Sequence, residues 1–142
     1  MLHLIILFLS GIILLTPVSR ANINEIILSD CFRDSSDNFM FRFFNSGHKF
    51  ISNKSSNSLV EIKPNGKDSI IYTLTNFNSK FAEGSRIDAS ESKNKTTQYT
   101  NVKLYKDTKK VEIKDKTTYL ENGKNVSKDG GIYNYNCASN KN

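Results

Sequence analysis

Cysteine is the residue type with the most definite chemistry in this sequence, which has Cys31 and Cys137 near the two ends of the region that follows an apolar leader. An even cysteine count in an exported domain is typical of a disulfide, so we predict one Cys31–Cys137 bond. Closing a loop of about 105 residues stabilises a fold by up to ~4 to 5 kcal/mol in the chain-entropy model. The alternative is an intermolecular pair or two free thiols.

Residues for catalysis are scarce. Beyond the leader the only histidine is His48, so a histidine pair for RNA hydrolysis and a histidine-rich metal site are both excluded. There is no Gly-x-Ser-x-Gly motif for a serine nucleophile. The segment Asp34–Asn38 lacks the glycine and glutamate of a calcium loop, and Ser46–Lys49 suggests that His48 is a solvated turn residue. We therefore expect no enzyme, no metal and no cofactor.

A cluster of apolar side chains is the first candidate binding surface. It consists of Phe39, Met40, Phe41, Phe43 and Phe44. In an extended strand, Met40 and Phe44 point opposite to the other three, so one face cannot hide them all. The cluster is either a central strand covered on both faces or an exposed or cavity-lining patch for a lipid or a protein partner.

Basic residues offer a second candidate surface. Lys109, Lys110 and Lys114 lie in a lysine-rich stretch of a chain whose net charge is +6. The stretch is either a solvated face or a surface that attracts an anionic glycan, a lipid headgroup or nucleic acid. Arginine is rare, which argues against a specific nucleic-acid partner because bidentate contacts to bases require guanidinium groups.

Asparagine side chains could carry glycans at three sequons, which begin at Asn53, Asn94 and Asn125. A used sequon must lie on the surface of an exported protein. In a chain this rich in asparagine, serine and threonine, sequons also arise by chance.

The N-terminus reads as a signal peptide over residues 1–21. Leu2–Leu15 is almost continuously apolar, and Ser19 and Ala21 fit the small positions before a cleavage site. The alternative is a membrane anchor, but a span needs about 20 apolar residues. We expect a secreted chain without a membrane span, folded as a single domain over residues 22–142.

Hydrophobic residues beyond the leader alternate with a period of two, which is typical of half-buried strands. Val60-Glu61-Ile62 alternates in this way, and Asn-Gly at residues 65–66 and 122–123 favours tight hairpins. Residues 82–95 form a polar stretch, and residues 23–28 fit a strand or a short helix. The segments expected to form strands are 39–43, 59–62, 69–75, 96–105, 110–114, 117–120 and 132–137.

These patterns predict an all-β fold, a single-domain antiparallel sandwich or barrel of about seven to eight short strands with one disulfide. Export without a catalytic constellation indicates a secreted non-catalytic binding protein that acts on an extracellular protein or glycan partner. A small carrier of an apolar ligand, with a phenylalanine-lined cavity for lipid, is the alternative. An extracellular structural component is a further alternative.

Overall fold

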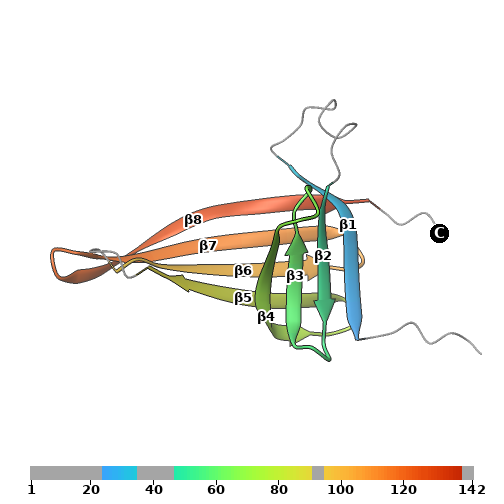
Figure 1. Cartoon of the computed structure of the whole chain (residues 1–142), viewed down its shortest axis with the longest axis horizontal. Helices are drawn as coiled ribbons and strands as arrows, with labels where there is room; N and C mark the ends of the chain where they lie inside the picture. Colours follow the sequence, from blue (N-terminus) through green and yellow to red (C-terminus); the bar gives the residue numbers. More distant parts are fainter. Residues whose placement is uncertain (1–23, 35–46, 91–94, 139–142) are drawn as a thin grey trace, which may run out of the picture.

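The computed structural model describes residues 24–34, 47–90 and 95–138, and these residues form a closed antiparallel β-barrel (Figure 1). Each strand pairs with the next along the chain, and the last pairs with the first. The predicted all-β class is confirmed, and the architecture is a barrel and not a sandwich. The strands are β1 (Glu25–Arg33), β2 (His48–Asn53), β3 (Ser58–Ile62), β4 (Ser69–Phe77), β5 (Phe81–Ala89), β6 (Thr97–Tyr105), β7 (Lys110–Glu121) and β8 (Lys124–Cys137).

The second half of the chain reaches beyond the barrel. In Figure 1, β1, β2 and β3 stand upright while β5 to β8 run across the view and continue to the left as a tapering sheet. β7 and β8 are the longest strands, with 12 and 14 residues. β5 to β8 therefore extend past one end of the barrel, whereas β1 to β3 do not.

Side chains that alternate along the strands fill the barrel. Val111 and Ile113, in the predicted strand 110–114, point inward and are 1% and 6% exposed. Phe50 and Leu59 are fully buried from the opposite wall. Other members of this core are Ile26, Leu28, Tyr72, Leu74, Val102, Leu104 and Tyr135.

The disulfide predicted from the cysteine count closes the barrel. Cys31 of β1 lies directly opposite Cys137 of β8, and their sulfur atoms are 2.05 Å apart. The β1–β8 seam has three paired positions, whereas β6 and β7 pair at nine. The bond thus crosses the shortest contact between neighbouring strands, and it is typical of proteins that fold in an oxidising compartment.

Both Asn-Gly pairs occur in hairpin connections, but their backbones differ. Asn122 and Gly123 have φ values of 50° and 75°, which is the two-residue type I′ turn that favours this dipeptide. In the β3–β4 connection only Gly66 has a positive φ, and the Asn65 side chain accepts hydrogen bonds from the backbone N–H groups of Lys67 and Asp68. The asparagine there closes the loop through its side chain.

Two strands differ from the sequence prediction. The expected polar stretch 82–95 begins inside β5, whose inward residues Ala82 and Gly84 are too small to produce an apolar alternation. β2 begins at the expected turn residue His48 and places Ser52 inward, so it too lacks the apolar pattern. Because buried positions in these two strands carry small or polar side chains, a pattern of alternating apolar residues does not reveal them.

Segments expected as separate short strands are parts of longer ones. Residues 110–114 and 117–120 both belong to β7, and residues 132–137 are the end of β8. The register of the pair shifts at Asp115, opposite Gly130 and Gly131, which is a β-bulge. A Cβ at Gly130 would lie 2.7 Å from the Cβ of Asp115, so glycine is required for the strands to approach there. The ambiguous residues 23–28 enter β1.

Candidate ligand-binding site

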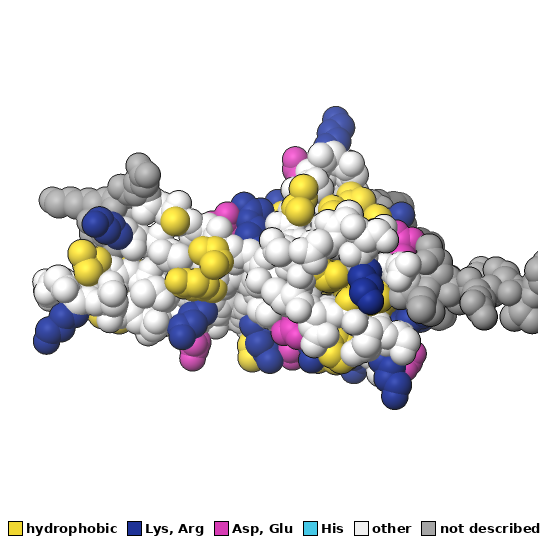
Figure 2. Space-filling model, turned by 90° about the horizontal axis from the view of Figure 1, so that it is seen from below, with side chains coloured by type: hydrophobic (Ala, Val, Ile, Leu, Met, Phe, Trp, Pro, Cys, Tyr) yellow, Lys and Arg dark blue, Asp and Glu magenta, His cyan; other side chains and the backbone are white. Residues whose placement is uncertain are grey.

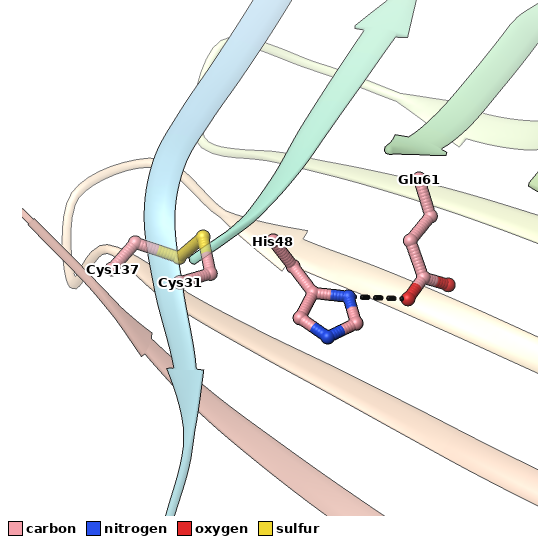
Figure 3. The surroundings of a disulfide bond; sticks show 4 residues. All are labelled: Cys31, His48, Glu61 and Cys137. Atoms are coloured by element: carbon pink, nitrogen blue, oxygen red, sulfur yellow. Dashed lines mark hydrogen bonds and ion pairs between the residues drawn. A yellow bond between two sulfur atoms is a disulfide. The ribbon is translucent and has the colours of Figure 1, made fainter. Parts of the chain in front are cut away.

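A buried carboxylate lies inside the barrel. Glu61 of β3 is 4% exposed, and its two oxygens are held by side chains from the strands on either side. The His48 Nδ1 atom lies 2.8 Å from Oε1, and the Tyr72 hydroxyl donates to Oε2 at 2.8 Å (Figure 3). Because an ionised carboxylate only accepts hydrogen bonds, Nδ1 of His48 carries the proton.

These contacts determine the charge of Glu61. Burial raises the pKa of the carboxyl, but the hydrogen bonds from His48 and Tyr72 and the nearby charges of His48 and Lys63 outweigh it, so the pKa lies below its usual value. The same environment raises the pKa of Tyr72, first through burial and then through the charge of Glu61 and the hydrogen bond to it. At neutral pH the barrel therefore encloses a charged Glu61 and a protonated Tyr72.

The interpretation of His48 as a solvated turn residue is wrong. His48 is the first residue of β2 and lies opposite Cys31 in the β1–β2 register, beside the disulfide (Figure 3). Its ring stacks on Phe50 at 6.2 Å between centroids and meets the Tyr135 ring at 5.1 Å. Contacts with these aromatic rings explain why His48 points inward although its neighbours in the sequence are polar.

A cavity of about 310 Å³ opens above Glu61. Its deepest lining residues are Glu61, Tyr72, Ile113 and Tyr135, each no more than 9% exposed. Towards solvent it is lined by Arg86, Asp88, Gln98, Thr100, Asp115 and Tyr133. The cavity thus runs from a buried floor to an exposed rim built from β5, β6, β7 and β8, the strands that extend past the barrel.

Charges on the wall of this cavity are unevenly matched. Arg86 donates from Nε and Nη2 to Oδ1 of Asp88, at 2.8 and 2.7 Å. Asp115 also lines the cavity, and it takes part in none of the ion pairs formed among residues 24–34, 47–90 and 95–138. The wall therefore carries a satisfied ion pair and one further carboxylate.

A second, larger hollow of about 550 Å³ lies on the outer face of the extended sheet. Exposed apolar side chains of Ile87, Tyr99 and Ile132 line it together with Lys114 and Lys116. Figure 2 shows apolar side chains in separate groups along one face of the molecule, with basic side chains beside them. This hollow has no buried charged floor comparable to Glu61.

The predicted lysine surface is spread out. Lys110 and Lys114 lie on the same face of β7 but four residues apart, which is about 13 Å along a strand. Lys114 pairs with Glu112 at 3.0 Å, and Lys109 lies in the turn before β7. The structure therefore does not gather these three charges into one site.

The other predicted sites fall into two groups. Phe39, Met40, Phe41, Phe43 and Phe44 lie outside the described residues, as do the sequon at Asn94 and the leader 1–21. Asn125 is exposed in β8, whereas Asn53 is half-buried and its side-chain oxygen accepts hydrogen bonds from the backbone of Ser55 and Ser56. Both described sequons remain candidates for glycosylation.

The cavity residues carry no sequence signal that singles them out. Val60 and Ile62 were expected to be the inward pair of their strand, but Leu59 and Glu61 point inward and the alternation is reversed. A charged residue on the inward face breaks the apolar alternation, so hydrophobic periodicity selects the wrong face of this strand. Arg86, Asp88 and Asp115 could not be recognised, because charged residues on strands are ordinarily solvated.

Comparisons with models of protein families, with curated proteins and with solved structures found no match to this chain. Within the described ranges, no helix has the length and apolar character needed to cross a membrane.

Proposed function

We propose that this protein is a secreted, non-catalytic binding protein that holds a small polar ligand in the mouth of its barrel. The observation that carries the proposal is the cavity of about 310 Å³ whose floor is the buried Glu61. Eight-stranded barrels are either filled by side chains or leave room for one small ligand. This volume is at the lower end of the range for small-molecule pockets.

The chemistry of the floor favours a polar ligand over the apolar one of the carrier hypothesis. An ionised carboxylate loses hydration when an apolar molecule covers it, and this costs free energy unless new hydrogen bonds replace the water. A ligand with a hydrogen-bond donor supplies those bonds. Each oxygen of Glu61 accepts one protein hydrogen bond, which leaves further acceptor capacity.

Binding fits the lining better than catalysis does. Both cysteines are joined in the disulfide, and neither serine nor cysteine lines the cavity. Glu61 is fixed by His48 and Tyr72, so its geometry is that of a preorganised acceptor. Preorganised groups bind with little loss of conformational entropy.

A pair of tryptophan substitutions on β6 tests the proposal. Thr100 lines the inner cavity and also borders the outer hollow, while its neighbour Asn101 lines the outer hollow alone. We expect Thr100→Trp to fill the cavity and abolish binding of the ligand that copurifies with the secreted protein, measured by native mass spectrometry. Asn101→Trp is the matched control and should retain it.

Three results would contradict the proposal. The first is the absence of any copurifying ligand together with no binder in a fragment screen followed by NMR. The second is ligand loss in Asn101→Trp but not in Thr100→Trp, which would favour a partner on the outer face, such as the predicted protein or glycan. The third is hydrolysis or group transfer by the purified protein that Thr100→Trp abolishes.

A further inference from the structure

We infer that the ligand of the barrel cavity is a small organic cation, an amine attached to a compact aromatic or apolar body. This inference depends on the proposed function, because it names the class of ligand for the same cavity. Three independent features of the cavity support it: the balance of charge on its wall, the tyrosine rings and the volume.

The charge balance is the first argument. Three carboxylates line the cavity, from Glu61, Asp88 and Asp115, against the single guanidinium of Arg86. Arg86 makes both of its described hydrogen bonds to Asp88 at the exposed rim. Glu61 forms an ion pair with His48, so Asp115 is the lining carboxylate that takes part in no ion pair among the described residues.

Charged groups next to the lining do not reverse this balance. His48 approaches Glu61 from β2 and donates one hydrogen bond to it, and Lys63 is an exposed residue at the end of β3 whose charge acts on Glu61 from outside. Arg33 of β1 is exposed and lies over the ring of Tyr133. Solvent and salt screen exposed charges, while a ligand inside the cavity experiences Glu61 at a lower effective dielectric.

The two carboxylates act on the same tyrosines. Glu61 of β3 and Asp115 of β7 both line this cavity. Burial is the largest cause of the raised pKa of Tyr72 and of Tyr135; Glu61 and Asp115 add to it, while Arg86 lowers the pKa of Tyr72 and Arg33 lowers that of Tyr135. An ammonium group between the two carboxylates can donate to both, because it carries several N–H donors and no acceptor.

Aromatic rings complete the environment for a cation. Tyr72, Tyr133 and Tyr135 all line the cavity. The guanidinium carbon of Arg33 lies 4.0 Å from the centroid of the Tyr133 ring, which shows that this ring already attracts a cation in the folded protein. A ligand cation near the other two rings would gain the same type of interaction.

The volume limits the size of the ligand. A cavity of about 310 Å³ corresponds to about ten water molecules at ~30 Å³ each. One ring with a short amine chain is compatible with this space, whereas a lipid with a long acyl chain is not. Ile70 and Ile113 provide apolar contact for the body of such a molecule.

The experiment compares three probes of similar shape and different charge: phenethylamine, phenethyl alcohol and 3-phenylpropionate. Their affinities for the mature, disulfide-bonded protein are measured by isothermal titration calorimetry at neutral pH. We expect the amine to bind about tenfold or more tightly than the alcohol, because a hydrogen bond between charged groups is stronger than a neutral one. The propionate should bind most weakly.

A matched pair of substitutions on β7 tests whether Asp115, which lines the cavity and also borders the outer hollow, attracts the amine; Asn101→Trp, which fills the outer hollow alone, should leave amine binding unchanged. Asp115→Asn keeps the shape of the inward side chain and should weaken amine binding by about tenfold while leaving the alcohol unchanged. Glu112→Gln removes the same charge from the same strand outside the lining and should leave both affinities unchanged. Circular dichroism and thermal melting confirm that both variants are folded.

The outcomes separate this inference from the proposed function. If the alcohol or the propionate binds as tightly as the amine and Thr100→Trp abolishes that binding, the cavity binds ligands but the preference for a cation is overturned. Failure of all three probes in a protein whose copurifying ligand is lost in Thr100→Trp also overturns the inference alone. If no ligand of any charge responds to Thr100→Trp, the proposed function fails with it.

Discussion

Reduction of the Cys31–Cys137 bond should strongly destabilise the barrel. The two cysteines are separated by 106 positions, and the chain-entropy model gives about 5 kcal/mol for a loop of this length at 25 °C. This is an upper figure, and we expect a loss of about 2 to 5 kcal/mol in the free energy of unfolding. Because the seam that the bond crosses has only three paired positions, few other contacts hold β1 against β8.

Urea unfolding of the oxidised and the reduced wild-type protein, followed by far-UV circular dichroism, measures this loss. Comparing the two redox forms keeps the sulfur atoms in place, which matters because Cys31 is fully buried and a substitution would add a packing change. A loss of 2 kcal/mol should lower the melting temperature by about 6 to 12 °C for a domain of this size. If the two forms unfold within about 1 kcal/mol of each other, the seam is held by something other than the disulfide.

Three further substitutions test other parts of the structure. Glu61→Gln should be less stable than wild type at neutral pH. Because the pKa of Glu61 is lowered in the folded protein, the difference in the free energy of unfolding should be full above pH 4.5 and should shrink as acid protonates the carboxylate. A difference that stays constant down to about pH 3 in urea titrations would contradict this. Gly130→Ala should cost about 1 to 3 kcal/mol, because the new Cβ meets Asp115 across the bulge; an unchanged urea midpoint would show that the bulge relaxes freely. Gly123→Ala should cost about 1 kcal/mol through its φ of 75°, and equal stability would mean that the turn adopts another geometry.

The fold class was predictable because its signals are local. Alternation in residues 110–114 and the Asn-Gly turns depend on neighbours in sequence, and both are found in the structure. The choice between sandwich and barrel was not predictable, because it depends on whether β8 meets β1. No local pattern encodes that closure, and a cysteine pair is compatible with either architecture.

The candidate site was largely hidden for the same reason. Glu61 and Asp115 are 54 positions apart in the sequence and come together only when the strands curve into a barrel. His48 was noticed but assigned to solvent, since its buried partners Phe50 and Tyr135 come from its own strand and from the far end of the chain. A functional cavity in a barrel depends on long-range register, which a single sequence does not reveal.

The extension of β5 to β8 beyond the barrel creates an exposed strand edge. A closed barrel has no free strand edge, but the β8 segment from Lys124 to Tyr133 pairs with β7 alone among the described strands. Such an edge invites other chains to add strands and begin aggregation. Here it carries Lys124 and Lys128, and it is bent by the bulge opposite Asp115. Charge and curvature make this edge a poor template for strands of other chains.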